Sequence, residues 1–156
     1  MKKHLSIGCG KLHEKSTEEI QWINLDKFAE VNPDVVHNMI DRNGFPFDDN
    51  TFGHVKAFCC LGQIERNDDF MFVMNEIHRV LKLEGNVWIY LPHKDYQICW
   101  HDPFNQRRTN EDHWLGFDET HSQYTCHNHY YGFSPWKDVK VETVNGFLSV
   151  WMTKSK

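Results

Sequence analysis

The chain has 156 residues and a mass of 18.6 kDa, which fits one domain and leaves no room for two. Hydrophobic residues make up 40% and charged residues 25% of the sequence, a composition that excludes intrinsic disorder. With 22 acidic and 17 basic residues the formal net charge is −5. Because Lys and Arg form no cluster larger than Arg107-Arg108, polymeric nucleic acid is an unfavourable partner.

Cysteine usage and hydropathy indicate the compartment. The five cysteines are an odd number, which does not suggest a disulfide framework. The apolar stretch after Met1–His4 is too short for a signal peptide, and the longest membrane-like run, Ala57–Leu61, is far below the roughly 18 residues of a spanning helix. We therefore expect a reduced, cytoplasmic protein with no membrane partner.

Three short strands are predicted in the first 37 residues. Leu5–Ile7 is an apolar run that stops at Gly8-Cys9-Gly10, and Gln21–Asp26 ends in a carboxylate. Asp34–His37 is the third strand. After turn residues at 45–50, His54–Cys60 predicts a fourth strand that is covered on both faces.

The following segment predicts a long helix and a fifth strand. Asn67 is a good N-cap, and apolar residues recur at helical spacing up to a stop at Gly85. Residues 86–91 then form a strand that Pro92 ends. A strand, a helix and a strand in this order predict a right-handed parallel crossover. The apolar helix positions are Phe70, Val73, Met74, Ile77, Val80 and Leu81.

The C-terminal region predicts a hairpin. Residues 140–144 and 147–151 flank Asn145-Gly146, which supplies the positive φ of a type I′ turn. The expected fold is therefore α/β, a Rossmann-like, mostly parallel sheet with helices on both faces in three layers and an antiparallel C-terminal hairpin. Residues 1–156 form a single domain, and residues 93–135, which show no periodicity, form a lid or substrate-side segment.

The glycines and the carboxylate after the first two strands indicate a nucleoside ligand. Gly8 and Gly10 follow the first strand, where glycine lets the backbone approach a ligand closely. Asp26 closes the next strand, 16 positions after Gly10, and can accept both hydroxyls of a ribose. His13 stands where a pyrophosphate site has its third glycine. The pattern therefore favours an adenosine-containing ligand without a pyrophosphate.

These segments together resemble the small class I S-adenosylmethionine-dependent methyltransferases. The resemblance spans nearly the whole chain, and it rests on the order and spacing of its pieces. The terminal hairpin resembles the reversed last strand that separates this fold from the dinucleotide binders. The matching segments are Leu5–Gly10, Ile23–Asp26, Phe45–Phe52, Glu76–Lys82 and the Asn145-Gly146 hairpin.

The resemblance implies S-adenosylmethionine as cofactor, with S-adenosylhomocysteine as its product. Ile7–Gly10 then line the methionine half and Asp26 binds the ribose. Either Asn38 or Asp41 holds the adenine, with Met39 as an apolar face for the base. The full set of expected cofactor-binding residues is Ile7, Gly8, Cys9, Gly10, Asp26, Lys27, Asn38, Met39, Asp41, Cys59 and Cys60.

Catalysis of methyl transfer requires that the donor and the acceptor are aligned. It requires a general base only where the nucleophile keeps its proton at neutral pH. His93 is the candidate base, because it follows the fifth strand and imidazole titrates near neutral pH. His101, Asp102 and His113 are further candidates in the covering segment. A structural, hydrogen-bonded histidine is the alternative role for His93.

The sequence leaves the activity with alternatives. Gly62-Gln63 stands where relatives often carry a Glu-His pair, which favours a non-catalytic binding or regulatory domain as one alternative. A histidine-rich metal-binding domain around Cys126, His127 and His129 is the other, although we assign no metal ligands. The acidic charge and the aromatic covering segment favour a small-molecule acceptor, and the same segment is a candidate contact for a homodimer.

Overall fold

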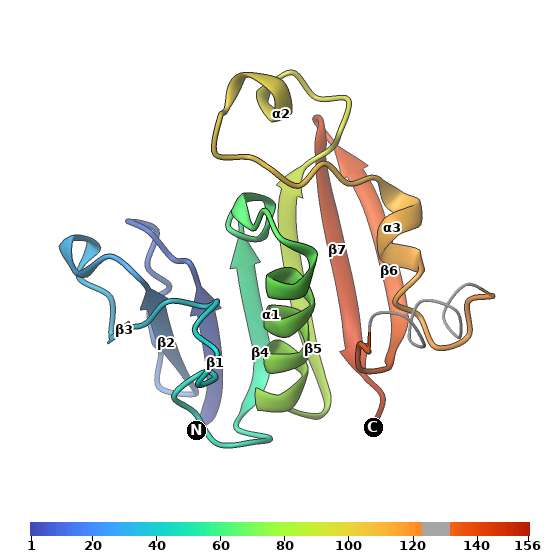
Figure 1. The fold of residues 1–156 in the computed structure, drawn as a ribbon. Helices are drawn as coiled ribbons and strands as arrows, with labels where there is room; N and C mark the ends of the chain where they lie inside the picture. Colours follow the sequence, from blue (N-terminus) through green and yellow to red (C-terminus); the bar gives the residue numbers. More distant parts are fainter. Residues whose placement is uncertain (123–131) are drawn as a thin grey trace.

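A computed structural model describes residues 1–122 and 132–156 of the chain. Its centre is a seven-stranded sheet with the order β3-β2-β1-β4-β5-β7-β6 (Figure 1). Strands β1 to β5 pair in parallel, and β7 runs antiparallel to both of its neighbours. The strands are β1 (Lys2–Ile7), β2 (Ile20–Asp26), β3 (Val35–Val36), β4 (Phe52–Phe58), β5 (Leu81–Pro92), β6 (Trp136–Val144) and β7 (Phe147–Lys154).

This topology confirms the Rossmann-like, mostly parallel sheet with an antiparallel C-terminal hairpin. The hairpin turn is formed by Asn145 (φ 52°) and Gly146 (φ 83°), the two positive φ values that a type I′ turn requires. The helices are α1 (Asn67–Val80), α2 (Ile98–His101) and α3 (Glu111–Leu115), with 3-10 turns η1 (Ala29–Val31) and η2 (Leu61–Gln63).

Helix α1 packs on one face of the sheet, where alternate strand residues are fully buried. Val73, Met74 and Ile77 have no exposed surface, and they belong to the same core as Val55 and Ile89 of the central strands. Asp68 and Asp69 occupy the first turn, where the negative charge of a carboxylate stabilises the helix. The amphipathic pattern of the sequence therefore places this helix correctly.

The helix ends earlier than its spacing predicts. It stops at Val80, and β5 begins at once with Leu81, whereas the apolar pattern predicts helix up to Gly85. Leu81 is extended (φ −72°, ψ 142°), pairs with Phe52 of β4 and is fully buried. Pairing in the sheet thus replaces the last helical turn, because it buries the same leucine and also satisfies its backbone.

The structure departs from the expected three layers, because α1 and α3 lie on the same face. Phe70 of α1 contacts Trp114 of α3, with ring centroids 5.8 Å apart, and Figure 1 shows both helices in front of the sheet. On the opposite face Lys56, Phe58 and Trp88 are only half-buried. Burial in β4 alternates along the strand, so the prediction that His54–Cys60 is covered on both faces is also wrong.

The reason lies in the connections among β1, β2 and β3. These strands progress across the sheet in the direction opposite to β4 and β5, so right-handed crossovers between them lie on the other face. Residues 8–19 cross that face without a helix, and Glu14 forms a salt bridge there with Lys56. Residues 27–34 contain only η1. Connections this short cannot supply a covering layer.

Arg79 joins α1 to the turn before β4. Its guanidinium donates to the Phe47 and Phe45 carbonyls, at 2.9 and 3.1 Å, and to Asp49 and Glu76. The Phe45 N–H donates to Glu76 at 2.6 Å. Burial acts to raise the pKa of Glu76, but the Arg79 guanidinium and the Phe45 N–H hold it below its usual value. Glu76 and Arg79, which belong to the Glu76–Lys82 segment of the sequence pattern, therefore hold the turn before β4 against α1.

His78 makes stability depend on pH. Burial lowers its pKa from 6.5 to about 4, while Nε2 lies 3.0 Å from the Pro135 carbonyl oxygen and must donate its proton there. The unfolded histidine binds a proton below pH 6.5, whereas the folded one binds it only near pH 4. The free energy of unfolding should therefore fall as the pH is lowered from about 6.5 to about 4. In His78→Gln, which keeps a donor, urea unfolding at pH 7, 5.5 and 4.5 should show a shallower fall. Equal slopes in both proteins would contradict this origin.

In the part of the chain that the structure describes, no helix is long and apolar enough to cross a membrane. The four described cysteines, Cys9, Cys59, Cys60 and Cys99, are free thiols.

Candidate functional site

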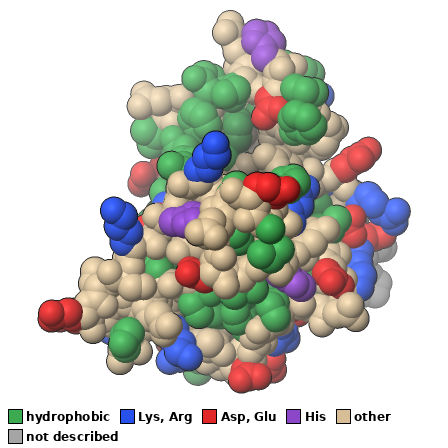
Figure 2. Space-filling view, turned by 90° about the vertical axis from the view of Figure 1, so that its left-hand side faces the viewer, with side chains coloured by type: hydrophobic (Ala, Val, Ile, Leu, Met, Phe, Trp, Pro, Cys, Tyr) green, Lys and Arg blue, Asp and Glu red, His purple; other side chains and the backbone are tan. Residues whose placement is uncertain are grey.

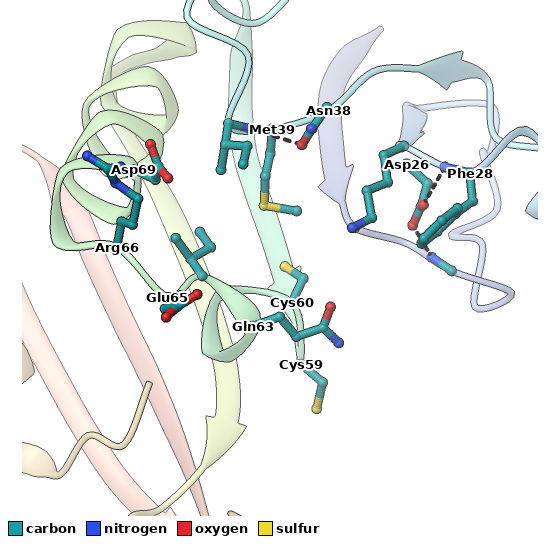
Figure 3. A pocket seen from close by; sticks show the side chains of 15 residues that line it. Asp26, Phe28, Asn38, Met39, Cys59, Cys60, Gln63, Glu65, Arg66 and Asp69 are labelled. Atoms are coloured by element: carbon teal, nitrogen blue, oxygen red, sulfur yellow. Dashed lines mark hydrogen bonds between the residues drawn. The ribbon is translucent and has the colours of Figure 1, made fainter. Parts of the chain in front are cut away.

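A cavity of about 460 Å³ opens at the carboxyl ends of β1, β2, β3 and β4 (Figure 3). Ligands in open parallel sheets bind at this edge, where the strand order reverses between β1 and β4. The side chains come from segments far apart in the sequence. The lining residues are Gly8, Gly10, Asp26, Lys27, Phe28, Asn38, Met39, Ile40, Cys59, Cys60, Gln63, Ile64, Glu65, Arg66 and Asp69.

Asp26 joins the glycine turn to the end of β2. Its Oδ2 accepts from the Gly10 N–H at 2.9 Å and its Oδ1 accepts from the Phe28 N–H at 3.0 Å. The residue is 7% exposed, so the carboxylate is held in one orientation. Each carboxylate oxygen can accept a second hydrogen bond, and Asp26 is one of the residues that line the cavity.

Gly8 lines the cavity at a position that has no room for a side chain. Its φ is +59°, and a Cβ there would lie 2.5 Å from Cys60 Cβ and 3.2 Å from Met39 Cε. Figure 3 shows Met39 extending towards Cys60. Backbone without a side chain therefore forms the cavity wall, and a larger residue at this position would displace Cys60 or fill the space.

The two neighbouring thiols differ in position. Cys60 is buried, its Sγ donates to the Ile7 carbonyl at 3.3 Å, and burial raises its pKa to about 12. Cys59 is half-buried with φ +54°, an unusual conformation for a residue with a side chain. Its N–H donates to the Tyr90 carbonyl at 2.7 Å. Both sulfurs are neutral thiols at physiological pH, because burial raises the pKa of Cys59 as well.

The two residues predicted for the adenine, Asn38 and Asp41, differ in their position relative to the cavity. Asn38 lines the cavity together with Met39, whereas Asp41 is not among the lining residues. The Asp41 carboxylate accepts from the backbone and side-chain nitrogens of Asn43, both at 3.0 Å, and so it closes a turn. Ile7 and Cys9 are also expected cofactor residues that lie outside the lining set, with Ile7 fully buried in the core.

Sequence reasoning missed one wall of the cavity. The segment from η2 into α1 contributes Gln63, Glu65, Arg66 and Asp69. Gln63 could have been predicted from the sequence, because it stands where relatives often carry a Glu-His pair. No sequence pattern assigned Glu65, Arg66 or Asp69 to a site, because charged residues around a helix start are ordinarily solvated or stabilise the helix N-terminus. The missed lining residues are Phe28, Ile40, Gln63, Ile64, Glu65, Arg66 and Asp69.

The segment after β5 returns to this wall. The Arg107 N–H donates to the Gly62 carbonyl at 2.8 Å, and Arg107 Nη2 donates to Asn67 Oδ1 at 3.1 Å. This segment also carries exposed apolar side chains, with Trp100 60% and Phe104 71% exposed. Figure 2 shows hydrophobic side chains gathered at the top of the molecule, level with α2. That residues 93–135 act as a lid stays a prediction.

His93 lies at the carboxyl end of β5, outside the lining residues of the cavity. Its Nδ1 accepts from the Asp95 N–H at 3.1 Å, and its Nε2 lies 3.3 Å from Glu111 Oε2. Glu111 also accepts from the Thr143 hydroxyl. Both ring nitrogens of His93 are therefore occupied, and its role as a base stays a prediction.

Metal ligation was the remaining sequence alternative. Within residues 1–122 and 132–156, no three His, Cys, Asp or Glu residues are placed to hold a metal ion. Cys126, His127 and His129, which carry that alternative, lie outside the described residues.

No protein-family model and no curated protein matches the sequence. Solved structures do match the fold. A methyltransferase dependent on S-adenosylmethionine from Archaeoglobus fulgidus superposes with a TM-score of 0.69 at 15% identity, over 98% of this chain and 86% of its own. A putative methyltransferase from Haloferax volcanii, in complex with the activator Trm112, gives 0.64 at 14% identity over 99% and 83%.

A third similar structure contains the cofactor. Phosphoethanolamine N-methyltransferase 2 of Haemonchus contortus, in complex with S-adenosyl-L-methionine, gives a TM-score of 0.67 at 13% identity over 99% of this chain and 49% of its own. All three matches extend over at least 98% of this chain. The chain therefore has the fold of the class I S-adenosylmethionine-dependent methyltransferases.

Proposed function

We propose that this protein binds S-adenosylmethionine in the cavity and transfers its methyl group to a small acceptor. The observation that carries the proposal is the joint placement of Gly8, Asp26 and Asn38 around one cavity. A glycine turn that admits no Cβ, a carboxylate with free acceptor capacity and a carboxamide are the groups that a nucleoside with a methionine tail requires.

Each part of the cofactor has a partner in the chain. The backbone of Gly8 and Gly10 lies against the methionine moiety, and Asp26 accepts from the ribose hydroxyls. Asn38 hydrogen-bonds the edge of the adenine, while Met39 packs on its face. The bound cofactor supplies an electrophilic methyl group on a sulfonium. The protein orients the acceptor towards that methyl and excludes water.

Lys27, Cys59 and Cys60 complete the proposed cofactor site. Lys27 and Phe28 follow Asp26 directly, and the Lys27 ammonium lies 4.8 Å from the Phe28 ring centroid. Cys59 and Cys60 follow β4 and form the floor between the glycine turn and η2. Figure 3 shows Glu65 and Arg66 on the side of the cavity opposite Asp26. We assign this wall, together with Gln63, to the acceptor.

The test is titration of the purified protein with S-adenosylhomocysteine in a calorimeter, followed by a methyl-transfer assay with a broad panel of small acceptors. We expect saturable binding with a micromolar dissociation constant. The proposal fails if neither S-adenosylmethionine nor S-adenosylhomocysteine binds at millimolar concentration. Binding without transfer to any acceptor would instead favour a regulatory domain on this fold, the alternative that Gly62-Gln63 supports.

His93 separates binding from chemistry. Because its ring lies outside the cavity lining and is held by Asp95 and Glu111, His93→Ala should change the affinity for S-adenosylhomocysteine by less than about twofold. If His93 is the base, the same variant lowers the rate of methyl transfer by about 100-fold or more. An unchanged rate would assign His93 a structural role, and a large loss of affinity would contradict its position.

A further inference from the structure

The sheet face opposite α1 carries a continuous row of aromatic side chains. We call it the aromatic face, and it includes side chains from β1, β2, β4, β5, β7 and the loop before α2. Most members are half-buried, while Trp151 is 43% and Tyr96 is 37% exposed. Its residues are His4, Trp22, His54, Phe58, Trp88, Tyr90, Tyr96, Phe147 and Trp151.

The rings contact one another across the strands. Tyr90 stacks on Phe58 with centroids 5.0 Å apart and on Phe147 with centroids 4.9 Å apart. Trp151 stacks on Trp88 and on His54, with centroids 5.8 Å apart in both pairs. Cross-strand ring contacts of this kind stabilise a sheet. No helix lies above the rings in the described residues, although residues 8–19 cross this face beside Trp22 and Lys56.

The charges at the centre of this face are paired, so that its centre has no net charge. Lys56 is the one lysine on its central strand, and its ammonium is paired with Glu14. Burial lowers the pKa of His4 and of His54, so both rings are neutral at physiological pH. The indole of Trp88 donates to the Ser149 hydroxyl at 2.9 Å. The exposed charges Lys140 and Glu142 lie at the β6 margin, with opposite signs.

An open face is unusual for parallel strands. Parallel sheets are normally covered on both faces. Here the face that packs against α1 is covered. Counted from β2 to the β6 margin, this face of the sheet crosses five strand spacings, about 24 Å, and the six residue steps of β5 from Asn86 to Pro92 add about 20 Å of length. This gives about 480 Å² of flat area before the relief of the rings is counted, compared with about 600 Å² per partner in the smallest stable interfaces.

We propose that a second copy of this chain covers the aromatic face in an isologous homodimer, sheet against sheet. A two-fold axis places each patch on its own copy, and a patch with a neutral centre meets its copy without like-charge repulsion. Lys140 and Glu142 then supply both signs to the rim. Two packed sheets lie about 10 Å apart, a separation that the outer ring edges of both copies fill.

The test is sedimentation equilibrium of the full chain between about 1 and 100 μM, a range that resolves micromolar self-association. The wild type should show a reversible monomer–dimer equilibrium. Trp151→Glu, on β7, and Tyr96→Glu, in the loop before α2, should each weaken self-association at least tenfold. Because both side chains are more than one-third exposed, the variants should stay folded, which circular dichroism verifies.

Trp100→Glu is the matched control. Trp100 is 60% exposed on α2, outside the aromatic face, so this variant should dimerise like the wild type. A wild type that is monomeric at 100 μM overturns the proposal. So does dissociation caused by Trp100→Glu and not by Trp151→Glu, which would move the contact to the segment around α2. A monomer that captures a different protein through the aromatic face would also overturn it.

Discussion

Replacing Gly8 with alanine should lower both the stability of the protein and its affinity for S-adenosylhomocysteine. At φ +59° an L side chain is strained by about 1 to 2 kcal/mol. The added Cβ would also lie 2.5 Å from Cys60 Cβ, and relieving such overpacking costs about 1 to 3 kcal/mol. We expect the melting temperature to fall by about 10 °C.

Gly10→Ala is the control for Gly8→Ala. Gly10 has almost the same backbone conformation, with φ +51°, but no atom lies within 4 Å of the Cβ that it would carry. Thermal unfolding should therefore show the strain without the overpacking, which leaves about 1 to 2 kcal/mol of destabilisation. An equal loss of stability in the two variants would show that the contact with Cys60 does not contribute to the destabilisation. The same pair measured by calorimetric titration tests whether Gly8 shapes the ligand site.

Replacing Asp26 with alanine should weaken the binding of S-adenosylhomocysteine by about 1 to 3 kcal/mol, the range for lost hydrogen bonds to a charged group. The variant removes the two acceptors proposed for the ribose. It also frees the N–H groups of Gly10 and Phe28, so the glycine turn loses its anchor. Calorimetric titration should show a dissociation constant raised by about 5- to 150-fold.

Asp41→Ala is the matched control, because it removes a carboxylate from the same edge of the sheet. The Asp41 carboxylate bonds to Asn43 and is not among the residues that line the cavity. Its variant should bind S-adenosylhomocysteine like the wild type. If Asp41→Ala abolishes binding and Asn38→Ala does not, the adenine assignment is reversed. If Asp26→Ala leaves the affinity unchanged, the ligand does not bind at this site through its ribose.

Local sequence signals determined the elements of this fold because their causes are local. The apolar periodicity of residues 70–80 specifies one buried helix face, and Asn145-Gly146 specifies a turn that only positive φ values allow. That Gly8, Gly10 and Asp26 lie together was predictable because the carboxyl ends of adjacent parallel strands lie at one edge. Eight of the expected cofactor residues line the cavity for this reason.

The tertiary structure decided what depends on distant partners. Leu81 belongs to β5 because Phe52 pairs with it, a contact that helical spacing does not reveal. The wall from Gln63 to Asp69 faces the cavity because α1 begins beside the end of β4. His93 has its ring nitrogens occupied by Asp95 and Glu111, the second of them 18 residues away.

The sequence by itself determined the strands, the long helix, the hairpin and the glycine and carboxylate pair, because short-range sterics and periodicity fix them. It did not determine which sheet face carries the helices. Trp88 and Phe58 look like core residues in the sequence, and only the crossovers of β1, β2 and β3 show that no helix of residues 1–122 and 132–156 packs on them. Coverage of a face is a property of connection length and handedness together, and only the assembled sheet displays both.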